Sequence, residues 1–136
     1  MKQRDGQGLA LSCASGVSID HYETALGSLR CFTGDPIAAA EAAIRADPGF
    51  VMAHVFKGYM YGLSTEASAM PVARACAEAA ASLPANARER GHVAALAHLA
   101  AGRWHLAGQT LEDLTIEFPT DALALQAGHQ IDFFTG

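Results

Sequence analysis

The chain has 136 residues, of which 51% are hydrophobic and 17% charged, so it is long enough for one domain and too apolar for a disordered tail. A net charge of −5 argues against a protein that binds the nucleic-acid backbone through a basic stripe. Alanine is abundant, and β-branched residues never alternate over six positions, which favours helices over strands.

Cysteines and apolar runs bear on the compartment. Cys13, Cys31 and Cys76 are too few for a disulfide scaffold, and an odd count leaves at least one free thiol. No CxxC or CxxH spacing supports a zinc site. The apolar run at 9–11 is too short for a signal peptide, and no run approaches a membrane span. The sequence therefore predicts a cytoplasmic protein that neither binds nucleic acid nor enters a membrane.

Capping residues, prolines and glycines divide the chain into an N-terminal extended segment, 1–17, and a helical repeat domain, 18–136. Helices are predicted over seven ranges: 19–33, 36–46, 50–63, 71–83, 87–101, 104–118 and from 120 or 121 to the end. Ser18, Asp35 and Asn86 are the expected N-caps. The stretch 64–70 fits either a loop or an extra helical turn. Short connections predict that consecutive helices pack as hairpins.

These turn signals repeat every 34 residues. Gly34, Gly102 and Gly136 lie at multiples of 34, and Ser68 fills the remaining position. Small or apolar residues follow at fixed distances in three columns: Ala39, Ala73 and Ala107; Ala43, Ala77 and Leu111; Ala46, Ala80 and Leu114. This period is typical of tetratricopeptide repeats. The predicted fold is all-α, with about seven helices in tetratricopeptide-like hairpins forming a right-handed superhelix. An ordinary bundle of alanine-rich helices is the alternative.

Several segments carry a more specific resemblance. They include Ala-Asp-Pro-Gly-Phe-Val-Met-Ala-His at 46–54, Asn-Ala-Arg-Glu-Arg-Gly-His-Val-Ala-Ala at 86–95, and parts of 9–26 and 111–134. In these segments the chain resembles the tetratricopeptide repeat protein 38-like family, over nearly its whole length but over only the N-terminal part of a typical member. The resemblance implies a repeat scaffold with no settled reaction, and it brings no catalytic residue with it.

The last predicted helix reaches the turn position of a fourth unit without its hairpin partner. Its apolar residues are therefore expected to be only partly covered: Leu123, Leu125, Ile131, Phe133 and Phe134. We expect either the continuation of a longer chain, with the last repeat incomplete here, or a homodimer through this helix.

The repeat register places the first helix of each hairpin on a concave face. Candidate partner-binding residues at the inner-face positions are His21, Thr24, Glu89, His92, Leu96, Gln126, Gln130 and Phe133. Because neither Lys nor Asn stands at these positions, a clamp for the C-terminal carboxylate of a peptide is not expected. The predicted function is a protein-interaction scaffold whose groove binds an uncharged or apolar segment of a protein or peptide.

Two alternatives stay open. The chain could be part of an enzyme or of a small-molecule-binding protein, in which His92, Glu89 and His21 line a pocket that C-terminal repeats complete. It could also be a structural domain that packs against the rest of a longer chain.

Acidic residues and histidines stand three apart at Glu89 and His92 and again at His129 and Asp132. A di-iron bundle needs two Glu-x-x-His motifs and two further carboxylates, and only one such motif is present. No metal, cofactor or catalytic residue is therefore assigned. The charged run 88–90 is expected to be a solvated first turn with weak local ion pairs.

Overall fold

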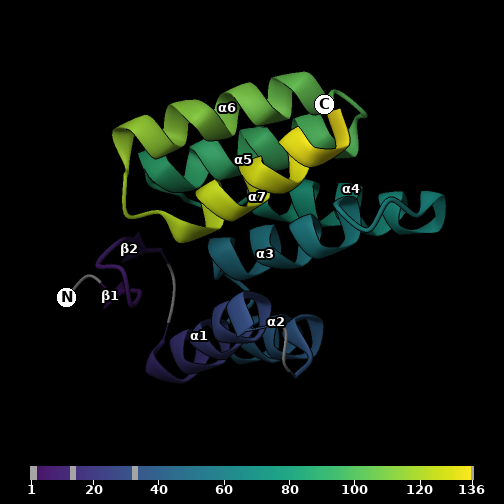
Figure 1. Ribbon diagram of the computed structural model, residues 1–136. Coiled ribbons are helices and arrows are strands. Elements are labelled where there is room, and N and C mark those ends of the chain that lie inside the picture. The colour runs from purple at the N-terminus through teal and green to yellow at the C-terminus, as the bar shows by residue number, and fades with distance from the viewer. Residues whose placement is uncertain (1–2, 13–14, 32–33, 136) are drawn as a thin grey trace.

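The structure is all-helical apart from a short N-terminal hairpin (Figure 1). This computed structural model describes residues 3–12, 15–31 and 34–135, without the side chains of residues 3, 30 and 31. Its elements are β1 (Gln3–Arg4), β2 (Ala10–Leu11), α1 (Gly16–Cys31), α2 (Pro36–Ala46), α3 (Val51–Gly62), the 3₁₀ turn η1 (Ala67–Ala69), α4 (Met70–Ala81), α5 (Ala87–Ala100), α6 (Trp104–Glu117) and α7 (Ala122–Thr135). The predicted helical class is confirmed for these residues. None of their helices combines the length and the apolar character needed to cross a membrane.

Local capping explains where two of the predicted helices begin. Asp35 Oδ1 accepts the Ala38 N–H at 3.1 Å, and Pro36 occupies the first helical position of α2, where no N–H is needed. At the start of α5, Asn86 and Glu89 form a reciprocal capping box. Both signals depend on residues close in sequence, which is why the sequence alone locates these helix starts.

Helix α1 begins at Gly16, three residues before the predicted start. Ser15 Oγ accepts the Ser18 N–H at 3.2 Å, and Ser18 Oγ accepts the Ser15 N–H at 2.9 Å. Ser15 is therefore the cap, and the assignment of this role to Ser18 is wrong. Either of the two serines could serve as the N-cap by residue type, and the backbone conformation determines which of them does. The predicted end of this helix, at Thr33, lies outside the described residues.

The segment between α3 and α4 combines both structures that its sequence allows. Residues 63–66 are a connection, and η1 then supplies one extra 3₁₀ turn that leads directly into α4.

The helices pack in chain order. Helices α1 and α2, α3 and α4, and α5 and α6 lie side by side as consecutive pairs, and α7 packs on α6. In Figure 1 the first pair lies at the bottom, the second in the middle, and the third at the top together with α7. Helix α3 also contacts α5, so the second and third pairs meet directly.

Glycines in α3 allow this close approach to α5. A Cβ at Gly58 would overlap Leu96 Cδ2 and lie 3.1 Å from the Cys76 Cβ, and a Cβ at Gly62 would lie 2.9 Å from Leu99 Cδ2. Both leucines are fully buried, so they have little freedom to move aside. The contact fills space that the repeat register assigns to the middle of a concave groove.

This packing predicts opposite effects for two glycine substitutions. Gly58→Ala should lower the free energy of unfolding by about 1–2 kcal/mol, because overpacking costs about 1–3 kcal/mol and alanine's helix propensity offsets up to about 1. Gly27→Ala, where the added Cβ meets no described atom within 4 Å, should raise it by about 0.5–1 kcal/mol. Urea unfolding followed by circular dichroism measures both values, and equal effects at the two sites would contradict the close approach.

Candidate functional site

Three of the eight predicted groove residues are inside the protein. Glu89, His92 and Leu96 are fully buried, so the prediction that they line an open groove is corrected. Leu96 fills the contact between α3 and α5, while the other two side chains are held in hydrogen bonds with buried or partly buried groups. The middle of the predicted groove is therefore filled by the contact between α3 and α5.

The other five predicted residues remain accessible at the two ends of the chain. Thr24, Gln130 and Phe133 are exposed, whereas His21 and Gln126 are half-buried. The structure brings the three α7 residues together in one groove, and it leaves the two α1 residues outside the lining of that groove.

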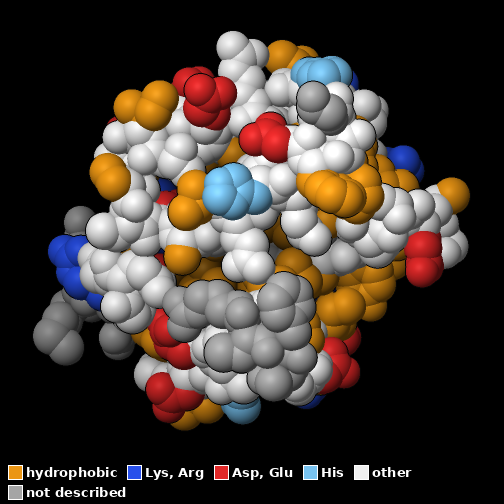
Figure 2. Space-filling model, in the orientation of Figure 1, with side chains coloured by type: hydrophobic (Ala, Val, Ile, Leu, Met, Phe, Trp, Pro, Cys, Tyr) orange, Lys and Arg blue, Asp and Glu red, His pale blue; other side chains and the backbone are white. Residues whose placement is uncertain are grey.

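We call this feature the α1–α7 groove. It has a volume of about 660 Å³ and is lined by Leu29, Ala122, Leu125, Gln126, His129, Gln130, Phe133 and Phe134. The lining is mostly apolar, and its described residues include no Asp, Glu, Lys or Arg. Figure 2 shows hydrophobic side chains at the surface between the lower and upper helix layers.

Aromatic side chains dominate the C-terminal part of the groove. Phe133 is 83% exposed and Phe134 47%, and their ring centroids lie 5.4 Å apart. Leu125, two turns earlier on α7, is 50% exposed. Large apolar side chains that gather in one exposed patch are typical of an interaction surface. Phe134 also packs edge-on against Trp104, with centroids 5.8 Å apart, so the single tryptophan reports on this groove.

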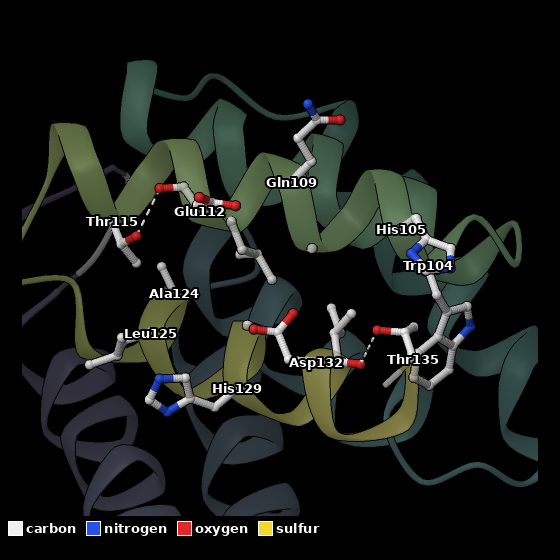
Figure 3. A pocket seen from close by; sticks show the side chains of 14 residues that line it. Trp104, His105, Gln109, Glu112, Thr115, Ala124, Leu125, His129, Asp132 and Thr135 are labelled. Atoms are coloured by element: carbon white, nitrogen blue, oxygen red, sulfur yellow. Dashed lines mark hydrogen bonds between the residues drawn. The ribbon is translucent and has the colours of Figure 1, made fainter.

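A second, more polar groove of about 520 Å³ lies between α6 and α7 (Figure 3). His129 and Asp132 line it from α7, with His105 and Glu112 on α6. Within the described ranges, no group of three or more His, Cys, Asp or Glu side chains has an arrangement that could hold a metal ion. The histidine and carboxylate spacing at 129–132 thus produces no metal cluster in the described structure.

A buried polar network fixes the start of α7 and thereby positions the α1–α7 groove. Asp121 Oδ2 accepts hydrogen bonds from Arg88 Nε at 2.8 Å and from His92 Nε2 at 2.7 Å. Its Oδ1 accepts from Arg88 Nη2 and from the Ala124 N–H, each at 3.1 Å. Burial alone would raise the pKa of Asp121, but the hydrogen bonds from His92 and Arg88 hold it well below its usual range. One ionised carboxylate therefore caps α7 and joins it to α5.

His92 completes a hydrogen-bonded chain in its neutral form. Its Nε2–H donates to Asp121, and its Nδ1 accepts from the Tyr59 hydroxyl at 2.7 Å. Burial is the largest influence and lowers the pKa of His92 despite the nearby carboxylate. Neutral imidazole with this tautomer satisfies both ring nitrogens, which explains how a histidine can be stable in the core.

The hydrogen-bonded series of Asp121, His92 and Tyr59 has the order carboxylate, imidazole, hydroxyl that acid–base relays use. All three side chains are buried, and burial raises the pKa of the Tyr59 hydroxyl well above its usual value. A substrate cannot reach this hydroxyl in the structure as it stands. These three hydrogen-bonded side chains form a structural connection between α3, α5 and the start of α7.

The charged run 88–90 also differs from its prediction. Arg90 is exposed, but Arg88 and Glu89 are buried, so the expected solvated first turn is wrong for these two residues. Their partners come from distant parts of the chain: Asp121 for Arg88, and Ser12 for Glu89. The signal in the sequence is Asp121, one of the two predicted starts of the seventh helix, which stands 33 residues after Arg88.

The residues of the enzyme alternative do not assemble into a shared pocket. Glu89 binds the backbone N–H groups of Ser12 and Asn86, His92 binds Asp121 and Tyr59, and His21 is half-buried on α1.

Comparison with known proteins gives no relationship on which to base a function: no protein-family model matches the sequence, and no solved structure matches the fold. The α1–α7 groove therefore has to be interpreted from its own chemistry.

Proposed function

We propose that this protein is a tetratricopeptide-like scaffold that binds an uncharged, apolar segment of a protein partner in the α1–α7 groove. The observation that carries the proposal is the exposed Leu125, Phe133 and Phe134 beside Gln126 and Gln130 in a groove whose described lining has no charged residue. The 34-residue period, the resemblance to a repeat family and the packing of helices in chain order support the right-handed superhelix that this function uses.

A helix of the partner is the segment that best suits this surface. Leu125, Gln126, His129, Gln130 and Phe133 follow one another at helical spacing along α7, so they form a stripe that a second helix can lie against. Apolar side chains of the partner would cover the aromatic rings, and the two glutamines would hydrogen-bond polar groups at the edge. A charged partner would lose hydration here without gaining a counter-ion.

The test begins with a displayed library of helical peptides, selected on the protein and counter-selected on the Phe133→Arg variant. Peptides that fit the proposal carry apolar residues at positions i, i+3 or i+4, and i+7, and they have no charge on that face. Emission from Trp104 reports binding, because Phe134 links this indole to the groove. A groove of this volume also falls in the range of small-molecule sites, so an outcome with no peptide selected but a neutral apolar dye bound would favour the small-molecule alternative.

Phe133→Arg should weaken binding of a selected peptide by about 30-fold or more, since a central aromatic contact is worth about 2 kcal/mol or more. Ile116→Arg is the matched control, because Ile116 is 72% exposed on α6 and lies outside the groove. Fluorescence titration gives both dissociation constants. Equal losses in the two variants would show that binding does not use the groove. Self-association that Phe133→Arg abolishes would instead identify a second copy as the occupant.

A further inference from the structure

The N-terminal hairpin packs against the start of α5 through β2 and the residue that follows it. Glu89 Oε2 accepts the backbone N–H of Ser12 at 2.8 Å, and its Oε1 accepts the Ser12 hydroxyl at 2.5 Å. Asn86 Nδ2 donates to the carbonyl of Ala10 at 3.1 Å. Leu11, between these contacts, is buried in the core. Recognition here depends on backbone groups, one hydroxyl and one buried leucine side chain.

The other end of the hairpin fits less well. Asp5 is buried, and its Oδ1 accepts the N–H groups of Gln7 and Leu9, which leaves Oδ2 to face Arg88 Nη1 at 3.7 Å. That distance is an ion pair without a hydrogen bond. Asp5 Oδ2, Arg88 Nη1 and the Tyr22 hydroxyl are buried and find no hydrogen-bond partner among the described residues.

These three atoms belong to one location. Burial raises the pKa of the Tyr22 hydroxyl, and the neighbouring Arg88 guanidinium offsets part of that rise. An arginine N–H and a phenol O–H, both unsatisfied, form a donor pair that fits a carboxylate oxygen. Asp5 brings a carboxylate to within 3.7 Å of Arg88 Nη1, too far for a hydrogen bond, because the same side chain also holds the turn of the hairpin.

We infer that Arg88 Nη1 and the Tyr22 hydroxyl form a carboxylate site, which Asp5 fills imperfectly, and that an acidic hairpin of a partner protein enters it by displacing the N-terminal hairpin. Each unsatisfied buried group weakens the docking of the hairpin, so a segment that reaches both donors has an advantage over it. The partner segment folds as a hairpin, with an acidic side chain before its turn and, seven residues later on the returning strand, a hydroxyl and a free backbone N–H that replace those of Ser12. This surface is separate from the α1–α7 groove and does not depend on its function.

The first test uses formate as the probe and the full chain with Asp5→Ala. Formate should raise the thermal midpoint of this variant by about 4 °C at ten times its dissociation constant, and it should leave the wild type unchanged relative to chloride of equal ionic strength. Glu23→Ala is the matched control, because Glu23 also contacts the hairpin, through the Gly6 N–H at 2.6 Å. Adding Tyr22→Phe to Asp5→Ala should reduce the formate effect. An equal shift in all variants, or in none, would overturn the carboxylate site.

The second test asks whether an acidic hairpin segment is recognised. A labelled peptide with the sequence of residues 3–12 is titrated into the full chain carrying Asp5→Ala and Ser12→Ala, whose helix content is first checked by circular dichroism. We expect this variant to bind the peptide saturably. The wild type should bind it at least tenfold more weakly, because its own hairpin fills the site. A peptide with asparagine in place of its aspartate should bind the variant at least tenfold more weakly. Equal binding of the two peptides, or none at millimolar concentration, would overturn the proposed partner.

Discussion

Asp121→Asn is expected to lower the free energy of unfolding by about 3–5 kcal/mol, the largest effect of any single substitution considered for this protein. The aspartate carboxylate is the hydrogen-bonded counter-charge of Arg88, which is only 4% exposed, and it also accepts from His92. Asparagine keeps the shape of the aspartate side chain but removes its negative charge. It also replaces the oxygen that accepts from His92 with an amide NH₂ group, which cannot accept a hydrogen bond. Arg88 then keeps only its 3.7 Å ion pair with Asp5 and loses its charged hydrogen-bond acceptor, which carries most of the cost. Urea unfolding measures the change.

Asp113→Asn is the matched control for this prediction, since Asp113 is exposed on α6, and it should change the unfolding free energy by less than about 0.5 kcal/mol. A second variant tests the mechanism. Arg88→Met combined with Asp121→Leu and Asp5→Asn removes all three buried charges, so it should be markedly more stable than Asp121→Asn. If the triple variant were as unstable as the single one, the cost would come from packing or from the lost cap rather than from an unpaired charge.

Acidification should destabilise the protein in two steps whose sign follows from the network. The pKa of His92 is lowered from 6.5 in the folded protein, so the unfolded chain takes up its proton first, and stability falls as the pH drops below about 6.5. The pKa of Asp121 is lowered from 3.8, so a second loss begins as the pH approaches 4. Each proton contributes at most about 1.4 kcal/mol per pH unit. Urea midpoints measured from pH 7.5 to 3.5 show both steps.

Substitution of histidines separates this network from the general effect of acid. His92→Gln should lower stability at pH 7.5 and flatten the step between pH 6.5 and 5. His105→Gln, at an exposed position on α6, should leave both the stability and the step in place. If the upper step persisted in His92→Gln, another group would be responsible, and the neutral histidine in the core would not be the cause.

Helix positions could be predicted because their signals are local. The Asp35-Pro36 start and the Asn86–Glu89 capping box each depend on residues within about one turn of one another. The error at the start of α1 has the same origin, since Ser15 and Ser18 are equally good local caps. Class and element order thus required no knowledge of distant contacts.

The exposure of the candidate groove residues could be predicted only in part. Gln126, Gln130 and Phe133 do share a groove, because α7 keeps one apolar face uncovered in the described structure. Helix α5 was harder, because alanines lie around much of its surface and give no clear apolar face. Without a clear apolar face, the simplest prediction for a charged run such as 88–90 is that its side chains are exposed to solvent.

The sequence by itself determined the helical class and the order of the helices, since capping, proline and glycine act over a few residues. Only the tertiary structure decided that Arg88, Glu89 and His92 are buried and that α3 packs directly on α5. Their burial is stable because Asp5, Ser12 and Asp121, which lie 29 to 83 positions away in the chain, supply the opposite charges and hydrogen bonds. A charged side chain is stable in a core when it has hydrogen-bonding and oppositely charged partners there. Which residues become those partners depends on how the helices pack.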